Sequence, residues 1–513
     1  MRLYQKDNRA SHWVNRMLAA ALMNLIMLIS VPMLMPADGW CDSPISDASQ
    51  ECLACHVTAT PTIVEDWKKS RHAATTPSQG MSKQALESRV SATKVPEDLL
   101  NVVVGCAECH TLNTSQHKDV FVHNEKKTHL TVTPRDCSTC HPTEAEQYEK
   151  NLMAFAHTNL AGNKLYGQLM TAINGTVRFD GQKTSITPPN EKTESESCFS
   201  CHGTKLEIKG LKKRDTDYGE MEFVEMSGYP NQGVGRINPD GSRGSCSSCH
   251  SRHQFSIKLA RQPYTCSQCH KGPDVPAYKI YSVSKHGNIF SSMSKEWNLD
   301  TVPWTAGKDF TSPTCATCHV SLVVDSEGKV ISKRTHQMSD RLPWRLLGLI
   351  YAHAHPKSPD TSIIQGKDGL PLPTTLDGKP LSEFLISSDE QKTRKIAMQG
   401  VCRTCHSEGW VNGHWERLEN TIKTSNEMTL TSTEMLSKAW KEKLANPDNI
   451  FDEGIEKQWI EQWLFFANST RLASAMMGTD YGVFDNGRWA MTKNIQDMLD
   501  RINFLRSVQK KEK

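Results

Sequence analysis

Sixteen of the seventeen cysteines occur in pairs with two residues between them, and each second cysteine is followed directly by histidine. Two thiols at this spacing can form thioethers with the two vinyl groups of one haem, and the adjacent histidine then becomes the proximal iron ligand. The sequence therefore predicts eight covalently bound c-type haems, attached at Cys52, Cys55 and His56; Cys106, Cys109 and His110; Cys137, Cys140 and His141; Cys198, Cys201 and His202; Cys246, Cys249 and His250; Cys266, Cys269 and His270; Cys315, Cys318 and His319; and Cys402, Cys405 and His406.

Zinc is the alternative cofactor, because cysteine and histidine are also its usual ligands. A zinc site does not require the histidine to follow the second cysteine directly. Since all eight motifs share this arrangement, the spacing favours haem.

A second axial ligand decides what each haem can do. Two histidines suit electron transfer, whereas an open face lets a substrate bind the iron. Eleven histidines beyond the N-terminal segment remain for this role: His72, His117, His123, His129, His157, His253, His286, His336, His353, His355 and His414. Any of them could instead be a hydrogen-bonded core or surface residue. Three close a Ser-Arg/Lys-His sequence, and we expect iron ligands at His72, His129, His157, His253, His286 and His336.

The composition agrees with a haem-filled interior. Hydrophobic residues make up 37% of the 513 residues, which is below the roughly 45–50% of ordinary globular chains. The pattern excludes a disordered chain, a plain disulfide scaffold and a polytopic membrane protein. Many of the 60 lysines and arginines are expected to pair with haem propionates, so they give no reason to infer nucleic-acid binding.

The N-terminus has the features of an export signal. Residues 1–16 carry four basic side chains and one acidic one, and residues 17–35 are uncharged and mostly apolar. We expect a signal peptide over 1–39 and a location in a periplasm or an equivalent lumen; an uncleaved membrane anchor is the alternative. Cys41 follows the bulky Trp40, which gives little support for lipidation.

Elements that position the motifs can be predicted coarsely. Seven motifs crowd into residues 40–340, with irregular spacing and many Gly, Pro, Ser and Thr residues between them, so short helices and long loops are expected. Residues 341–513 hold the eighth motif and then apolar residues at helical spacing around 435–444, 455–464 and 491–508. The expected fold is mainly α with long loops, a multihaem core and a C-terminal helical bundle. Trp459 and Trp463 are expected in the helical core or at a subunit interface.

Two local stretches carry a family resemblance. Cys269-His270-Lys-Gly-Pro-Asp274 leads into Tyr281-Ser-Val-Ser-Lys-His286-Gly287, and Met477-Gly-Thr-Asp-Tyr481 lies in the helical tail. With eight Cys-x-x-Cys-His motifs, the chain resembles the hydroxylamine oxidoreductase family of octahaem cytochromes c. Related octahaem and pentahaem nitrite reductases carry a Cys-x-x-Cys-Lys site, which this sequence lacks.

The resemblance implies a catalytic fourth haem with an open distal face, held by Cys198, Cys201 and His202, and seven electron-carrying haems. An Asp-His pair after the sixth motif lines the substrate pocket in the family; here Asp274 matches, but Val275 replaces the histidine and cannot transfer a proton. Oxidising members also join the catalytic haem to a tyrosine of a neighbouring subunit, and Tyr481 lies in the corresponding tail.

The function implied by the resemblance is interconversion of hydroxylamine, nitric oxide and nitrite, with electrons exchanged with a small redox partner such as a c-type cytochrome. A homotrimer, with or without a small cytochrome subunit, is also implied. The direction stays open, and Val275 favours a reductive or weakly oxidative member. The alternatives are an electron conduit without substrate chemistry, or a sulfur-oxyanion reductase on an octahaem scaffold.

Overall fold

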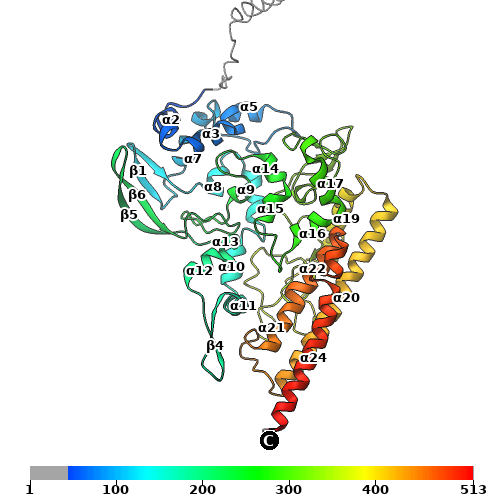
Figure 1. Ribbon diagram of the computed structural model, residues 1–513. Helices are drawn as coiled ribbons and strands as arrows, with labels where there is room; N and C mark the ends of the chain where they lie inside the picture. The colour runs from blue at the N-terminus through cyan, green and yellow to red at the C-terminus, as the bar shows by residue number, and fades with distance from the viewer. Residues whose placement is uncertain (1–43, 512–513) are drawn as a thin grey trace, which may run out of the picture. The chain divides into compact units, whose positions relative to one another are not determined.

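Short helices joined by long loops carry the first seven motifs (Figure 1). The computed structural model describes residues 44–511, so the expected signal peptide and Cys41 lie outside the described residues. The helices of this part are α2 (Asp47–Ala59), α3 (Pro61–Lys68), α4 (Arg71–Ala74), α5 (Pro77–Met81), α6 (Glu97–Leu100), α7 (Ala107–His110), α8 (Pro134–Cys137), α9 (Pro142–Glu149), α10 (Ala156–Ala161), α11 (Lys164–Asn174), α12 (Glu191–Glu196), α13 (Cys198–His202), η1 (Cys246–Ser248), α14 (Ile257–Arg261), α15 (Pro263–Ser267), α16 (Ala277–Val283), α17 (Lys285–Met293), η2 (Ser294–Glu296) and α18 (Cys315–His319).

Local sequence explains why these helices are short. Proline occupies the first turn of α3, α5, α8, α9 and α15, where its fixed φ and missing N–H favour a helix start. Serine, threonine or asparagine side chains cap α2, α4, α5, α11, α12, α14 and α17. Each segment therefore begins at a defined residue, and apart from α2 and α11, which have 13 and 11 residues, these helices supply at most about two and a half turns.

The strands form small sheets, mostly antiparallel hairpins between segments that are close in the sequence. β1 (Val120–His123) pairs with β2 (Lys126–His129), β3 (Thr176–Phe179) with β4 (Thr184–Thr187), and β5 (Glu207–Thr216) with β6 (Gly219–Ser227). β8 (Val323–Val324) lies between β7 (Trp304–Thr305), which runs parallel to it, and the antiparallel β9 (Val330–Ser332). β10 (Trp344–Arg345) pairs with β11 (His353–Ala354). The sheets contain only two or three strands, so helices and loops dominate the fold.

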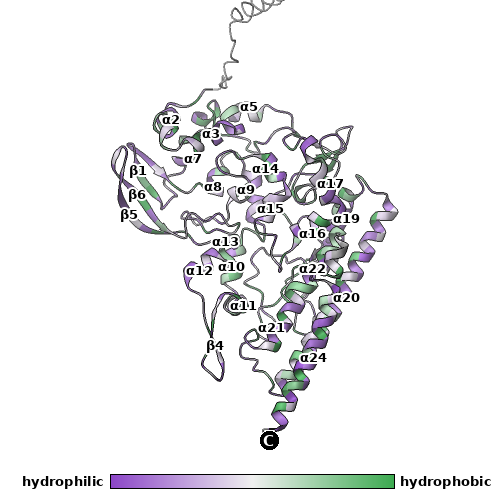
Figure 2. Cartoon of the chain, in the orientation of Figure 1, coloured by the Kyte–Doolittle hydropathy of each residue, from purple (hydrophilic) through white to green (hydrophobic). Residues whose placement is uncertain are grey.

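The C-terminal part is a bundle of longer helices: α19 (Ser388–Cys402), α20 (Glu408–Lys441), α21 (Gly454–Ile460), the π-helical segment η3 (Glu461–Ala467), α22 (Asn468–Met476), α23 (Thr479–Val483) and α24 (Arg488–Lys511). α20 and α24 alternate hydrophilic and hydrophobic residues along their length (Figure 2). All three predicted amphipathic stretches are helical, which confirms the expected mainly α fold with a C-terminal bundle. Trp459 and Trp463 are buried in the core of this bundle.

Residues from Ile45 onward form one compact unit. Between residues 44 and 511, every helix is too short or too polar to cross a bilayer.

Candidate haem sites and active site

Each haem motif folds as one helical turn. The amide of the motif histidine donates to the carbonyl of the first cysteine in the second, third, fifth, sixth and eighth motifs, at 2.8–3.0 Å. Side chains three and four residues apart share one helix face. Both thiols and the imidazole of a motif therefore point to the same side, as attachment of a single ring requires.

One cavity of about 1730 Å³ runs through the haem-rich part, and seven of the eight motifs contribute residues to its lining. The first motif lies outside that lining, on the exposed side of α2. All sixteen cysteines between Cys52 and Cys405 are free thiols. The described residues thus offer both the space and the reactive groups that several attached haems need.

Five proximal histidines face a second imidazole. Two imidazoles on opposite faces of one metal ion, each bonded at about 2 Å, have ring centres about 6 Å apart. The structure shows this separation for His56–His123 (6.1 Å), His141–His72 (6.2 Å), His110–His253 (6.5 Å), His250–His336 (6.4 Å) and His406–His286 (6.1 Å). Burial lowers the pKa of His72, His253 and His336 to about 4, which keeps these rings neutral and able to bind a metal.

Four of the six expected distal ligands, His72, His253, His286 and His336, therefore face a proximal histidine. His123, opposite His56, was not among the six. It ends β1, and its ring lies 6.3 Å from that of Phe223 on β6. Three histidines fall within residues 117–129, and no neighbouring sequence distinguishes His123 among them; only the strand pairing selects it.

His129 has a different environment from the other expected ligands. Its ring is 6.1 Å from His110, but its Nε2 lies 2.8 Å from the Leu112 carbonyl and its Nδ1 3.2 Å from the Thr131 carbonyl. The His129 carbonyl accepts from His110 Nδ1 at 2.9 Å. His129 thus supports the second motif through its backbone carbonyl, and each of its ring nitrogens lies near a backbone carbonyl.

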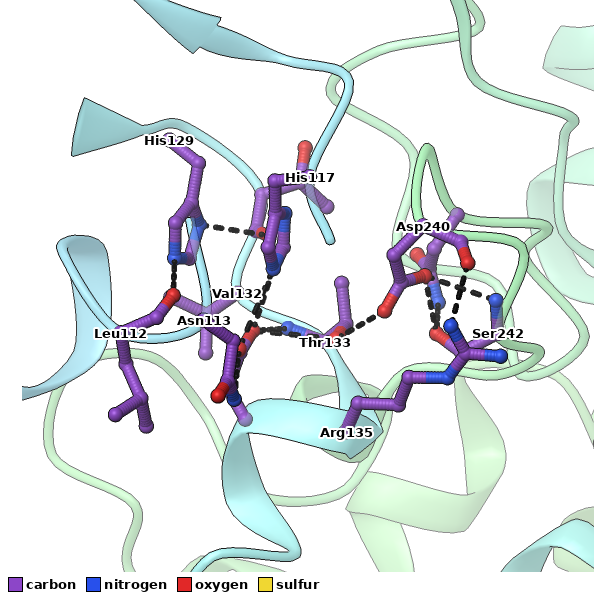
Figure 3. A network of polar contacts seen from close by, with 12 residues as sticks. Leu112, Asn113, His117, His129, Val132, Thr133, Arg135, Asp240 and Ser242 are labelled. Atoms are coloured by element: carbon purple, nitrogen blue, oxygen red, sulfur yellow. Dashed lines mark hydrogen bonds and ion pairs between the residues drawn. The ribbon is translucent and has the colours of Figure 1, made fainter. Parts of the chain in front are cut away.

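His117 and two aspartates complete this polar network (Figure 3). The His117 ring stacks on His129 with centroids 3.6 Å apart; its Nδ1 donates to Asp119 at 3.0 Å and its Nε2 to Asp136 at 3.3 Å. These hydrogen bonds outweigh burial and raise the pKa of His117 to about 9. One possible metal-ligand atom from each of His117, His129 and Asp136 lies within 4.8 Å of the other two. The ring nitrogens of the two histidines, however, already contact carboxylate or carbonyl oxygens of the protein.

The same network ties α8 to the loop before the fifth motif. Thr133 Oγ1 donates to Asp240 at 2.8 Å, and the Arg135 guanidinium donates to the Asp240 carbonyl at 2.7 Å. Ser242 in turn donates to the Asp240 carboxylate (Figure 3). The third motif, which begins at the end of α8, is thereby held against the fifth.

Thiols of different motifs also meet. The thiol of Cys137 lies close enough to that of Cys246 for each to influence the other's ionisation, and the same holds for Cys201 with Cys269 and for Cys266 with Cys315. The attachment points of the third and fifth, fourth and sixth, and sixth and seventh motifs are therefore immediate neighbours.

Three proximal histidines, His202, His270 and His319, face no second imidazole at this separation within the described residues. His157, an expected ligand, lies beside the fourth motif: its Nδ1 donates to the Gly203 carbonyl at 2.7 Å and its ring is 4.8 Å from Phe199. His353 is fully buried, and its Nε2 has no hydrogen-bond partner among residues 44–511.

Asp274 follows the sixth motif, and its charge acts on both His202 of the fourth motif and His270 of the sixth. It lines the cavity together with Cys198, Cys201 and His202, and its charge raises the pKa of His202 against the lowering effect of burial. Asn468 Nδ2 donates to the Asp274 carbonyl at 3.2 Å, which ties this loop to α22. Val275 lines the same cavity, so an apolar side chain occupies the place beside the carboxylate.

Tyr481 is buried within its own chain. Its side chain is 7% exposed and packs with Ile280, Leu472 and Ala473. Burial raises the pKa of its hydroxyl. Tyr481 is absent from the cavity lining that the described residues form around the fourth motif.

The serine of two Ser-Arg/Lys-His sequences caps the helix that carries the ligand. Ser70 Oγ accepts from the Ala73 amide at 3.1 Å at the start of α4, and Ser284 Oγ accepts from the Gly287 amide at 3.2 Å at the start of α17. His72 and His286 are then the second residues of these helices. N-capping fixes where each helix begins, and hence where each imidazole is presented.

The residues present fit covalent haem on three counts: free thiols paired on single helical turns, opposed neutral imidazoles, and a cavity large enough for several rings. Comparison with known proteins agrees. A family model described as seven times multi-haem cytochrome CxxCH matches residues 237–341, and one for cytochrome c554 and c-prime matches residues 51–133.

Individual relatives extend this match over the described chain. A solved structure named a hypothetical multiheme protein is 40% identical, with a TM-score of 0.85, and the match covers 91% of this chain and 97% of that one. The reducing HAO-like protein complex of Kuenenia stuttgartiensis gives a TM-score of 0.60 at 17% identity over 91% and 86% of the two chains, and shares the fold.

A curated protein of Kuenenia stuttgartiensis, named a probable nitrite reductase-hydroxylamine oxidoreductase fusion protein, is 26% identical over 392 residues. The match covers 74% of this chain but 36% of that protein, so this chain corresponds to about a third of its length. These matches and the motif geometry show that the chain belongs to the multihaem cytochromes c and shares the fold of an HAO-like protein.

Proposed function

We propose that this chain binds eight haems and is an oxidoreductase for small inorganic nitrogen compounds, with its active site at the fourth motif. The observation that carries this proposal is the position of Asp274: a carboxylate lines the cavity beside Cys198, Cys201 and His202, and His202 faces no second imidazole among the described residues. The names of the two Kuenenia proteins support this chemistry.

The haems supply substrate binding at an open iron and storage and transfer of electrons. The chain supplies the proton. Asp274 is the group that gives up or accepts it, either directly or through water, because Val275 cannot. Asn468 holds the Asp274 backbone by the hydrogen bond described above and so orients the carboxylate.

Five opposed histidine pairs make the first, second, third, fifth and eighth motifs electron carriers. The contacts between thiols of neighbouring motifs support a continuous relay. Cys55 and Cys405 are the exposed cysteines among the sixteen, and Trp410, itself 37% exposed, stacks on His406 at 3.9 Å. A small redox partner, such as a c-type cytochrome, would therefore exchange electrons at the first or the eighth motif.

We propose that the chain reduces nitrite, nitric oxide or hydroxylamine, and that it oxidises such nitrogen compounds weakly if at all. Burial of Tyr481 among Ile280, Leu472 and Ala473 supports this direction, because a tyrosine that cross-links to a neighbouring subunit's haem must reach out of its own chain. Export to a periplasm or an equivalent lumen, and assembly into a homotrimer, are parts of the same proposal.

Turnover assays on the holoprotein test this function. In the reductive assay, the holoprotein should catalyse electron transfer from reduced viologen to nitrite or hydroxylamine. In the oxidative assay, with hydroxylamine as electron donor and an oxidised c-type cytochrome as acceptor, turnover should be slower or absent. Turnover of tetrathionate without any nitrogen substrate would show a sulfur-oxyanion reductase instead. No turnover with any of these substrates would favour an electron conduit.

A further inference from the structure

Four arginines gather in the wall of the cavity near the third and fifth motifs: Arg71, Arg89, Arg261 and Arg334. They come from four separate segments of the chain. Arg261 is buried, and Arg89 and Arg334 are partly buried. Arg71 is exposed. Bringing these guanidinium groups together, three of them at least partly buried, costs free energy unless anions lie among them.

The cluster shows the expected mutual repulsion. Burial, together with the charges of Arg334, Arg261 and Arg71, lowers the pKa of Arg89 to about 9. Glu144, which forms an ion pair with Arg334, acts in the opposite direction. Asp300 and Asp309 act on Arg261 in the same way, so the four cations outnumber the three carboxylates near them.

The recorded partners of three of these arginines are neutral. Arg71 donates to the Asp300 carbonyl at 2.6 Å, Arg89 to the Leu86 and Ser88 carbonyls at 3.1 and 2.7 Å, and Arg261 to the Leu299 and Thr301 carbonyls at 2.8 and 2.7 Å. Backbone carbonyls fix the positions of the side chains but do not neutralise their charge.

The cluster is tied to the imidazoles of two motifs. Arg71 precedes His72, and the Arg89 carbonyl accepts from His141 Nδ1 at 2.8 Å, so the cluster contacts both members of the third motif's pair. Arg334 lies two residues before His336, which faces His250 of the fifth motif. Arginines of the cluster thus lie beside axial histidines of both motifs, so one cluster can serve both.

We propose that Arg71, Arg89, Arg261 and Arg334 form a shared carboxylate-binding site that holds the propionates of the haems attached at the third and fifth motifs. Guanidinium groups bind carboxylates in a two-pronged geometry, and each of the two haems carries two propionates, on the edge of the ring opposite its thioethers. The site depends on haem attachment and not on which substrate the fourth motif uses.

A soluble oxyanion has the same chemistry as a propionate and is the other source of negative charge for this cluster. The two sources differ in one respect: a propionate is covalently tied to its haem, whereas a soluble anion exchanges with the solvent. Inorganic phosphate is a suitable probe for the second.

The test is a potentiometric titration of the holoprotein, monitored by the EPR signals of its low-spin haems, for Arg89→Gln against wild type at several pH values. Loss of a nearby positive charge should shift one or two haems to a more negative midpoint potential, because the oxidised iron carries one more positive charge. It should also steepen their pH dependence, because a propionate with fewer cationic partners is protonated at higher pH.

Arg178→Gln, on the exposed strand β3, is the control and should leave all potentials unchanged. If Arg89→Gln does not acquire its haems, Arg71→Gln replaces it, because the Arg71 side chain is exposed. This variant should shift the midpoint potentials of the same haems in the same direction. Unchanged potentials in both variants would overturn the proposal. Potentials of wild type that move with added inorganic phosphate, and stop moving in Arg89→Gln, would assign the site to a soluble oxyanion and also overturn it.

Discussion

The carboxylate of Asp274 has the most direct chemical role assigned to any one side chain. We expect Asp274→Asn to lower kcat/KM for nitrite or hydroxylamine by about 100-fold, the lower end of what proton transfer by a positioned side chain contributes. Asp217→Asn, an exposed change in the turn between β5 and β6, is the matched control. Haem content and the visible spectrum should be the same in both variants. If Asp274→Asn were as active as Asp217→Asn, Asp274 would be excluded as the proton donor.

His117 should control stability in mild alkali. Its pKa is raised in the folded protein to about 9 from an ordinary value near 6.5, so the protonated ring stabilises the fold. That contribution is complete below about pH 6.5 and is lost as the pH rises through about 9. Asp119 and Asp136 have lowered pKa values, so their contribution is lost only in acid.

We therefore expect the midpoint of thermal unfolding to fall between about pH 6.5 and 9 in wild type, and to fall less in His117→Gln. The exposed neighbouring substitution Lys118→Gln should keep the wild-type slope. Parallel curves for wild type and His117→Gln would show that His117 is not protonated in the folded state.

At the level of elements, helix caps present the axial ligands. Ser284→Ala removes the cap of α17, which should cost about 1 kcal/mol and loosen His286 opposite His406. We expect a lower unfolding midpoint and a broadened or shifted low-spin EPR signal for the haem of the eighth motif. Ser282→Ala should change neither, because this exposed hydroxyl donates to the Lys279 carbonyl and caps no helix. An unaltered EPR signal in Ser284→Ala would contradict a positioning role.

The C-terminal helices could be predicted from the sequence because their apolar residues recur with helical spacing, and burial of Trp459 and Trp463 follows from the same periodicity. The Ser-Arg/Lys-His sequences predicted His72, His253 and His286 as ligands, and the structure places each of them opposite a proximal histidine. His123 could not be selected in the same way. Its position depends on the β1–β2 register and on Phe223 nearly a hundred residues away, and long-range pairing of this kind leaves no local pattern.

For the whole molecule, the cavity makes folding depend on haem attachment. If no haem filled the cavity of about 1730 Å³, its mainly apolar lining would face water, and the burial of apolar surface that stabilises a fold would be lost there. A folded domain has only about 5–15 kcal/mol of stability. The low hydrophobic content of the chain indicated this dependence. Which motifs are neighbours in space could not be predicted, because it follows from tertiary contacts such as that of Cys137 with Cys246.

We accordingly expect the chain made without haem attachment to be digested rapidly by a protease that leaves the holoprotein intact. Circular dichroism in the aromatic region should also be lost in the haem-free chain. A haem-free chain that resists the protease and keeps its aromatic signal would show that the fold does not need its haems.

The measurement that tests the central claim most directly is carbon monoxide binding to the fully reduced holoprotein, counted per chain. The open position at the fourth motif predicts carbon monoxide binding to at least one haem, and the five opposed histidine pairs predict at least five haems that do not bind it. No carbon monoxide binding would mean that all haems are six-coordinate and that the chain is an electron conduit. Binding at more than three haems would contradict the histidine pairs.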